Sequence, residues 1–408
     1  MKTYLVGGAV RDKLLDYPVH ERDWVVVGAT PEQMLQLGYQ QVGKDFPVFL
    51  HPETHEEYAL ARTERKTAPG YKGFVVHADP DVTLEQDLQR RDLTINAIAM
   101  DETGQLVDPY HGQRDLQQKI LRHVSEAFSE DPVRILRVAR FAARYAHLGF
   151  TLADETLALM QSMVAAGEVD ALIPERVWQE MQRALGERNP EVFIQVLRDC
   201  HGLEKILPEI DCLYGIPQPE QFHPEIDTGV HTMMVLQQAV KLSHKTTVRF
   251  AALVHDLGKC LTPKQYWPSH RGHEEKGVPV IEKLCQRLRI PNEHKDLAVL
   301  ASRFHLNVHR AFELRPDTLV KILEKLDGLR KPERFEDFLL VCSADIHGRK
   351  ELEDQPYPQA DYFRQAMATV RDVDISELKQ QNLDGKAMAE GIRRLRVEAI
   401  KTLKEKKI

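Results

Sequence analysis

Cysteine is scarce in this chain of 408 residues, which has five cysteines at irregular spacing and no Cys-x-x-Cys pair. A disulfide framework or a structural zinc site needs more cysteines, or closer spacing, than this. The sequence therefore predicts five reduced thiols, at Cys200, Cys212, Cys260, Cys285 and Cys342.

Long hydrophobic runs and a surplus of positive charge are also missing. Near the N-terminus Arg11 and Asp12 interrupt the apolar residues, so the sequence predicts neither a signal peptide nor a membrane span. The net charge of −7 excludes a nucleic-acid-binding protein that relies on overall positive charge, so any such surface must be a local patch. The content of 42% hydrophobic and 29% charged residues is that of an ordinary globular protein, which we expect to be cytoplasmic.

The first thirty residues form a compact unit of strand, glycine turn, helix and second strand. Residues 4–6 predict a strand, Gly7-Gly8 a turn, residues 9–12 the start of a helix, and residues 24–27 a second strand. Glycines let backbone N–H groups approach a ligand closely, and the helix start behind them favours an anion. Arg11, in the first helical turn, can add charge-assisted hydrogen bonds to a phosphate.

Two carboxylates, Glu21 and Asp23, stand two residues apart at the entrance to the second strand, so both side chains point to one face. Such a pair repels itself unless a hard cation such as Mg²⁺ lies between the oxygens. Each feature is common by itself, since most glycine pairs are plain turns and most Glu-x-Asp pairs are solvated strand edges. Their order and spacing together indicate nucleotidyl transfer.

Residues 7–12, Gly-Gly-Ala-Val-Arg-Asp, resemble the signature shared by bacterial CCA-adding enzymes and poly(A) polymerases, in the nucleotidyltransferase superfamily of DNA polymerase beta. The resemblance implies that Gly8 and Arg11 bind the nucleotide and that Glu21 and Asp23 bind Mg²⁺. The family usually carries Asp-x-Asp, so the longer Glu21 side chain alters the metal geometry. Glu57, on a later strand, is a further candidate for a third carboxylate.

Two more stretches resemble motifs of the same family. Residues 89–97 are similar to Arg-Arg-Asp-Phe/Leu-Thr-x-Asn-Ala, which implies that Arg91 binds phosphate and that Asp92 orients it. Without that context, paired arginines also suit a helix C-terminus, where positive charge is favoured. Further along, Arg137 and Arg140 are expected to hold the triphosphate.

The helix expected from about residue 132 can be capped by Ser129 or Asp131. Asp131 and Arg134 are three residues apart and share a helix face. A carboxylate and a guanidinium together match the Watson–Crick edges of cytosine and adenine and mismatch those of uracil and guanine. An ion pair within the helix is the simpler alternative. The match to the family motif Glu-Asp-x-x-Arg implies that this pair selects the base.

Four residues in the second half follow the order His…His-Asp…Asp, which resembles the HD superfamily of metal-dependent phosphohydrolases. The residues are His231, His255, Asp256 and Asp345. A single histidine on a helix is more often a core residue, but all four positions are filled, which favours a metal site. Imidazole and carboxylate ligands suit a divalent transition ion such as Ni²⁺, or Mg²⁺. Additional ligands or a general acid can come from His270, His273 and His305.

The predicted fold class is α+β, because strands and helices mix up to about residue 125 and helices dominate afterwards. We expect a polymerase-beta-like nucleotidyltransferase head at residues 1–125 and a helical neck with the base-selection helix at 126–210. An HD phosphohydrolase domain at 225–348 and a helical C-terminal tail at 349–408 follow. Prolines between residues 208 and 224 mark the main boundary.

Essentially the whole chain resembles the multifunctional CCA enzymes of gamma-proteobacterial type. The resemblance implies template-independent addition of C, C and A to tRNA 3' ends from CTP and ATP. It also implies phosphatase, 2'-nucleotidase and 2',3'-cyclic phosphodiesterase activities in the HD domain. The expected partners are tRNA, CTP and ATP, without a membrane, for a monomer or a homodimer. The alternatives are a poly(A) polymerase, or an HD phosphohydrolase whose head only binds tRNA.

Overall fold

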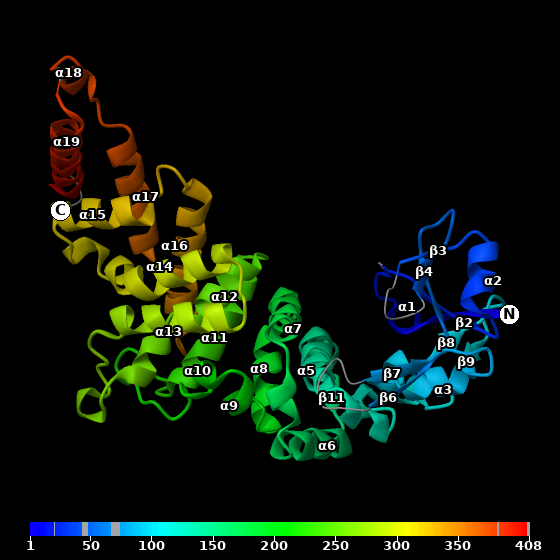
Figure 1. The fold of residues 1–408 in the computed structure, drawn as a ribbon. Coiled ribbons are helices and arrows are strands. Elements are labelled where there is room, and N and C mark those ends of the chain that lie inside the picture. The colour runs from blue at the N-terminus through cyan, green and yellow to red at the C-terminus, as the bar shows by residue number, and fades with distance from the viewer. Residues whose placement is uncertain (20, 43–47, 67–73, 382, 406–408) are drawn as a thin grey trace. The chain divides into compact units, whose positions relative to one another are not determined.

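The computed structural model describes the chain except for residues 20, 43–47, 67–73, 382 and 406–408 (Figure 1). The chain divides into two compact units, which we call the first unit (Met1–Ile206) and the second unit (Leu207–Ile408). Each unit is described by itself.

A seven-stranded sheet with the order β3-β4-β5-β2-β1-β8-β9 organises the beginning of the first unit. Its strands are β1 (Lys2–Val6), β2 (Asp23–Val27), β3 (Gln40–Gln41), β4 (Val48–Leu50), β5 (Glu57–Leu60), β8 (Ala99–Met100) and β9 (Leu106–Val107). Only β2 and β5 run parallel within this sheet. Strands were predicted at residues 46–50 and 58–61 and a hairpin at 97–107, and they correspond to β4, β5 and β8–β9; residues 46 and 47 lie outside the described residues.

Short helices and small sheets complete this part of the first unit. They are α1 (Gly8–Leu14), α2 (Pro31–Gln36), α3 (Leu84–Gln89), α4 (Gly112–Gln118), the antiparallel pair β6 (Thr63–Lys66) and β7 (Phe74–His77), and the parallel pair β10 (Ile120–Leu121) and β11 (Thr151–Leu152). Thr30 and Thr83 form the predicted capping boxes of α2 and α3. Val25 and Val26 alternate into separate hydrophobic clusters, so β2 is buried from both faces and holds Asp23 at its start firmly.

Among the described residues, five α-helices form the rest of the first unit: α5 (Val133–Tyr145), α6 (Asp154–Ala165), α7 (Pro174–Gly186), α8 (Pro190–Asp199) and α9 (Leu203–Ile206). The amphipathic pattern of residues 175–200 predicts one helical run, and this prediction is wrong in one respect, because the structure has two helices there. Pro190 lacks a backbone N–H and is suited to the first turn of a new helix, so the chain breaks at residues 187–189 and starts again as α8.

The second unit is helical among its described residues. Its helices are α10 (Pro208–Asp211), α11 (Thr228–Leu242), α12 (Thr246–Val254), α13 (His273–Arg287), α14 (Asn292–His309), α15 (Pro316–Leu326), α16 (Pro332–His347), α17 (Pro358–Arg371), α18 (Ser376–Lys379) and α19 (Gly385–Glu405). The apolar α12 is buried over most of its length, so the His255-Asp256 turn that follows it is positioned from inside the core.

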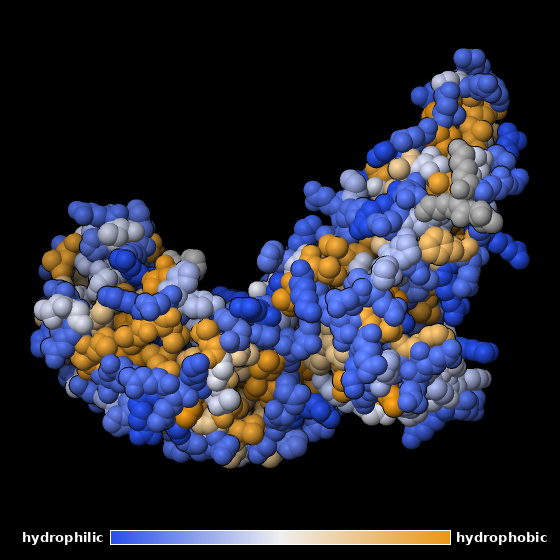
Figure 2. Space-filling view, turned by 180° about the vertical axis from the view of Figure 1, so that it is seen from behind, coloured by the Kyte–Doolittle hydropathy of each residue, from blue (hydrophilic) through white to orange (hydrophobic). Residues whose placement is uncertain are grey.

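The outer surface carries both polar and apolar residues. Figure 2 shows a face that is mostly hydrophilic, with hydrophobic residues exposed in patches between the polar ones. Among the described residues, no helix combines the length and the apolar character that crossing a membrane requires.

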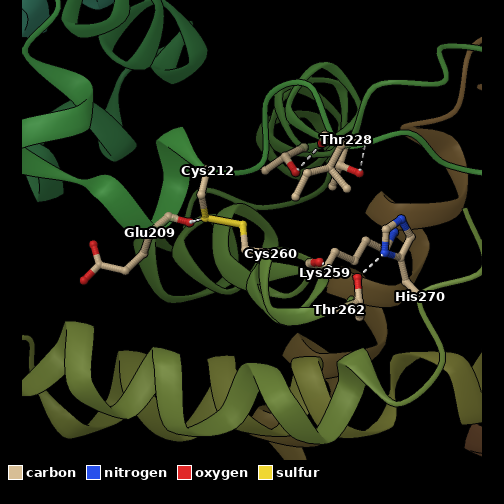
Figure 3. The surroundings of a disulfide bond; sticks show 9 residues. Glu209, Cys212, Thr228, Lys259, Cys260, Thr262 and His270 are labelled. Atoms are coloured by element: carbon tan, nitrogen blue, oxygen red, sulfur yellow. Dashed lines mark hydrogen bonds between the residues drawn. A yellow bond between two sulfur atoms is a disulfide. The ribbon is translucent and has the colours of Figure 1, made fainter. Parts of the chain in front are cut away.

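The prediction of five reduced thiols is wrong for two cysteines, because Cys212 and Cys260 form a disulfide (Figure 3). Cys212 follows α10, and Cys260 lies in the short 3-10 helix η5 (Leu257–Leu261) just after the His255-Asp256 turn. The fold brings their Cα atoms to 6.0 Å across a sequence separation of 48, which no local spacing reveals. Cys200, Cys285 and Cys342 are free and buried.

We expect reduction of this disulfide to destabilise the second unit. Closing a loop of this length is worth up to about 4 kcal/mol in the chain-entropy model, which corresponds to a melting shift of roughly 10 °C for a unit of this size. Thermal melting with and without dithiothreitol measures the shift, and Cys212→Ser should melt like the reduced protein under both conditions. A melting temperature that does not respond to reductant would contradict the expectation.

Candidate functional site

The glycine turn predicted from the sequence brings an arginine against the backbone. Gly7 has φ +66 and joins β1 to α1, and a Cβ atom there would lie 2.9 Å from Nη1 of Arg91. The positive φ therefore favours glycine, and a side chain there would also displace the end of the Arg91 side chain. Arg11 of α1 donates to the Asn96 side chain and pairs with Asp12 at 2.8 Å. The guanidiniums of Arg91 and Arg11 therefore both lie beside the Gly7-Gly8 turn.

These groups line a cleft of about 920 Å³ in the first unit. Ten arginines line it: Arg11, Arg62, Arg90, Arg91, Arg134, Arg137, Arg140, Arg144, Arg176 and Arg183. Six carboxylates also line it: Asp12, Glu21, Asp23, Asp92, Asp131 and Glu187. Although the chain has a net charge of −7, this cleft is a local positive surface of the kind predicted from the sequence. Its charge suits a polyanionic ligand.

The predicted carboxylate pair lies in this cleft. Burial raises the pKa of Asp23, Arg91 partly offsets that rise, and the neighbouring charge of Glu21 adds to it. A carboxylate pushed toward protonation by a like-charged neighbour gains most from a cation, so the pair fits Mg²⁺. Glu57 pairs in register with Asp23 across the parallel strands β5 and β2, although it is not among the described residues that line the cleft.

Buried carboxylates behind the cleft hold its arginines in place. Asp87 is fully buried and binds Arg90 at 2.8 Å and Arg91 at 3.1 Å. Glu180 of α7 pairs with Arg140. Each guanidinium is thereby fixed by a partner on its inner side while the side chain still lines the cleft.

Asp92 does not orient Arg91 as expected, because its partner is Arg137, whose Nη2 lies 2.6 Å from Oδ2. Burial alone would raise the pKa of Asp92, but Arg137 and hydrogen bonds from Asn96 and the Leu93 backbone hold that pKa well below its usual range. Asp87, which the sequence analysis did not single out, takes the role assigned to Asp92. It lies one helical turn before Arg91, and that spacing could have indicated it.

The expected base-selecting residues both line the cleft, but not as a pair on one helix. Asp131 is extended and precedes α5, and its side chain accepts from the Val133 N–H at 3.0 Å. The N-cap of α5 is Pro132, so the prediction of Ser129 or Asp131 as the capping residue is wrong. Its side chain lies 3.5 Å from Arg176. Arg134 donates to the backbone oxygens of Ala127 and Arg90, which fixes its guanidinium.

A second cluster lies inside the second unit, where three helices bring the His…His-Asp…Asp residues together. His231 of α11 lies with Nε2 at 3.1 Å from Oδ1 of Asp345, on α16. His255 lies with Nε2 at 3.3 Å from Oδ2 of Asp256 and 3.8 Å from Oδ1 of Asp345. All four side chains are buried.

Further residues of the second unit extend this cluster. His273 of α13 and His305 of α14 lie with Nε2 at 3.1 Å and 3.7 Å from Oδ1 of Asp256. His270 does not join them, since its ring contacts Thr262 and the Pro217 carbonyl. The sequence analysis missed Glu225, which lies 2.9 Å from His231, and His309, which lies 2.7 Å from Asp345.

The donor set of this cluster fits a divalent ion. Within the described part of the chain, Nε2 of His255 and Oδ1 of Asp256 are buried and make no hydrogen bond. Burial alone would lower the pKa of His255, but the carboxylates of Asp256 and Asp345 raise it to about 9. Burial lowers the pKa of His305 to about 3. Converging imidazoles and carboxylates with such perturbed pKa values are typical of a metal centre.

Three family models match the chain, and two of them include residues of the cleft in the first unit and of the cluster in the second unit. Residues 3–122 match the poly A polymerase head domain, residues 149–213 a probable RNA- and SrmB-binding site of polymerase A, and residues 228–331 the HD domain. Fold, cleft and cluster therefore define a nucleotidyltransferase that also carries an HD domain. The expected α+β fold class is confirmed.

Full-length relatives identify the family. The chain is 66% identical over 404 residues to a multifunctional CCA protein of Thioalkalivibrio sulfidiphilus, covering 99% of each chain. It is 62% identical over 404 residues to the one of Teredinibacter turnerae, covering 99% of this chain and 98% of that protein. The chain belongs to the multifunctional CCA protein family, and the expected resemblance is confirmed.

Solved structures support the fold. A CCA-adding enzyme in an apo form matches 97% of this chain and 87% of its own with a TM-score of 0.66 at 17% identity. A Thermotoga maritima CCA-adding enzyme complexed with tRNA matches 98% and 91% with a TM-score of 0.64 at 18% identity.

We expect Asp92→Asn to cost about 2 kcal/mol of stability, because Arg137 loses its charged partner. The cost is moderate because Arg137 is partly exposed and solvent screens its charge. The folded pKa of Asp92 lies below the unfolded value of about 3.9, so this stability is present above that pH and is lost as the pH falls below it. Urea unfolding of wild type and variant should therefore differ most at pH 7, and the difference should become steadily smaller as the pH falls below about 4. A difference that stays constant with pH would count against the pair.

Proposed function

We propose that the first unit adds C, C and A to the 3' end of tRNA from CTP and ATP without a nucleic-acid template. The observation that carries this proposal is the arginine-lined cleft with Glu21 and Asp23 beside the Gly7-Gly8 turn. An array of fixed guanidiniums suits a triphosphate, and a carboxylate pair beside it suits the metal that phosphoryl transfer requires. The names of the full-length relatives support the same activity.

In this proposal Arg11, Arg91, Arg137 and Arg140 bind the triphosphate, and Gly8 lets the backbone approach it. Glu21 and Asp23 hold two Mg²⁺ ions, which when bound lower the pKa of the tRNA 3'-hydroxyl and stabilise the leaving pyrophosphate. Glu57, in register with Asp23, is the candidate for a third carboxylate.

Asp131 and Arg134 select the base. The Arg134 guanidinium is held by two backbone oxygens, so its plane has a fixed direction in the cleft. Asp131 accepts from the amino group of C or A while Arg134 donates to the ring nitrogen beside it. Uracil and guanine offer the opposite pattern, and the resulting unpaired polar groups make rejection steep.

The test is to incubate the protein with Mg²⁺ and tRNA lacking its CCA end, with each labelled nucleotide singly and then with CTP plus ATP. We expect two C residues followed by one A, and no U or G. Replacing both Asp131 and Arg134 by alanine should relax this choice roughly tenfold or more, the scale of one lost charged hydrogen bond. Arg198→Ala, exposed on α8, is the control.

Other products would change the assignment. A long A tract would mean a poly(A) polymerase. If the double variant loses most of its activity but the remaining activity keeps the same nucleotide selectivity, base selection by Asp131 and Arg134 is refuted. No incorporation at all would leave the HD domain as the enzyme, with Glu21 as the weak metal ligand.

The second unit, in our proposal, hydrolyses phosphate esters at damaged tRNA 3' ends, with phosphatase, 2'-nucleotidase and 2',3'-cyclic phosphodiesterase activities. The buried cluster of His231, His255, Asp256 and Asp345 supports it. These residues would hold a divalent ion such as Ni²⁺ or Mg²⁺, which when bound supplies a hydroxide near neutral pH and polarises a phosphoryl oxygen. We place both activities in the cytoplasm, in a monomer or a homodimer.

We expect His255→Ala to abolish hydrolysis of 2',3'-cyclic AMP and to leave CCA addition intact, because the cluster loses a central ligand. Hydrolysis with added Mn²⁺, Ni²⁺ or Mg²⁺ and CCA addition are measured on the same preparation. His244→Ala, on an exposed loop after α11, is the matched control. Hydrolysis that persists in His255→Ala would assign the activity elsewhere.

A further inference from the structure

An arginine lies beside the metal-type cluster of the second unit, and the activity proposed above gives it no role. Arg349 follows the end of α16, four residues after Asp345, and its Nη2 lies 3.9 Å from Oδ1 of that carboxylate. The side chain is 14% exposed, so the charge is largely enclosed by protein yet in contact with solvent.

The backbone around Arg349 is held in place from two sides. Gly348 has no room for a side chain, because a Cβ atom there would lie 2.7 Å from the backbone N and Cα of Val235 on α11. The Lys350 N–H donates to Oε2 of Glu225 at 3.3 Å. Arg349 is therefore presented to the cluster by a rigid segment.

The donors of Arg349 are not used up. Its Nε is buried, and no described residue accepts a hydrogen bond from it. The 3.9 Å contact with Asp345 is too long to be a hydrogen bond. Lys259, the other cation beside the cluster, is already occupied, since its Nζ lies 2.6 Å from Asp256 and donates to Gln218.

The charges around the cluster favour an anionic ligand once a metal is present. Among the described residues, Glu225, Asp256, Asp345 and the partly exposed Glu274 lie at the cluster, together with two cations, Lys259 and Arg349. Histidines that bind a metal are neutral, so a divalent ion offsets the excess of negative charge and lets an anion approach. Arg349 is one of the two cationic side chains beside the cluster, and its planar guanidinium suits phosphate oxygens.

We infer that Arg349 binds the phosphate group of the substrate hydrolysed in the second unit. The guanidinium donates to the non-bridging phosphate oxygens while Asp345, four residues before it, contributes to the metal centre. The inference rests on the hydrolase activity proposed above and adds to it a residue that recognises a phosphomonoester or phosphodiester.

The test compares the full-length wild type with Arg349→Met, Arg349→Lys and the control Arg371→Met, whose arginine is exposed on α17 and pairs with Asp372. Mn²⁺ affinity is measured by electron paramagnetic resonance. Inhibition by inorganic phosphate and the KM and kcat for 2',3'-cyclic AMP are measured on the Mn²⁺-loaded protein. Thermal melting shows whether each variant is folded.

We expect Arg349→Met to raise KM and weaken phosphate inhibition by about tenfold to a hundredfold, with Mn²⁺ affinity not reduced. Arg349→Lys should restore part of the loss because it keeps the charge, and Arg371→Met should match the wild type. A fall in Mn²⁺ affinity that accounts for the whole loss of activity would make Arg349 a positioning residue for Asp345. Unchanged KM and phosphate inhibition would overturn the inference outright.

The two proposals can fail separately. If the wild type and Arg349→Met hydrolyse 2',3'-cyclic AMP equally well, the proposed hydrolase activity is supported and the proposed role of Arg349 is refuted. If the wild type does not hydrolyse 2',3'-cyclic AMP, broadening of the ³¹P line of inorganic phosphate by the Mn²⁺-loaded protein still measures phosphate binding. Broadening that is lost in Arg349→Met would support the phosphate site without the hydrolase activity. Equal broadening in both proteins would refute the phosphate site.

Discussion

Like charges must be held close together in the first unit, and the rest of that unit is arranged around this constraint. Ten arginines line one cleft, and their mutual repulsion would spread them if nothing opposed it. Asp87 and Glu180 behind the cleft and Asp92 in its wall oppose it, each buried and each bound to one or two guanidiniums. The cleft is thus preorganised for an anion before the anion arrives, which is the condition for strong electrostatic stabilisation.

The second unit solves the converse problem. Its cluster collects carboxylates and imidazoles in the core, where an uncompensated negative charge is costly. Lys259 offsets one carboxylate directly, and Arg349 lies near another without hydrogen bonding to it. A metal ion and a phosphate together would complete this balance. In both units, therefore, charged side chains are held in place for a ligand of opposite charge.

Much of this was predictable where the signal is local. The glycine turn, the strand entered through Glu21 and Asp23, the capping boxes and the alternation of helix and strand all depend on residues close in sequence. Partnerships across the fold were not predictable: Asp92 binds Arg137 on α5, and Cys212 pairs with Cys260. Glu225 and His309 escaped for the same reason, since only folding brings them to His231 and Asp345.

We propose that the cleft of the first unit binds both the triphosphate and the base of one nucleotide. A crystal structure of the protein with Mg²⁺ and a non-hydrolysable CTP analogue tests it most directly. The account predicts the triphosphate on Arg11, Arg91, Arg137 and Arg140, with the cytosine edge against Asp131 and Arg134. A triphosphate bound in the cleft with its base directed away from Asp131 and Arg134 would contradict selection by the protein. A triphosphate bound outside the cleft would contradict the whole account of the site.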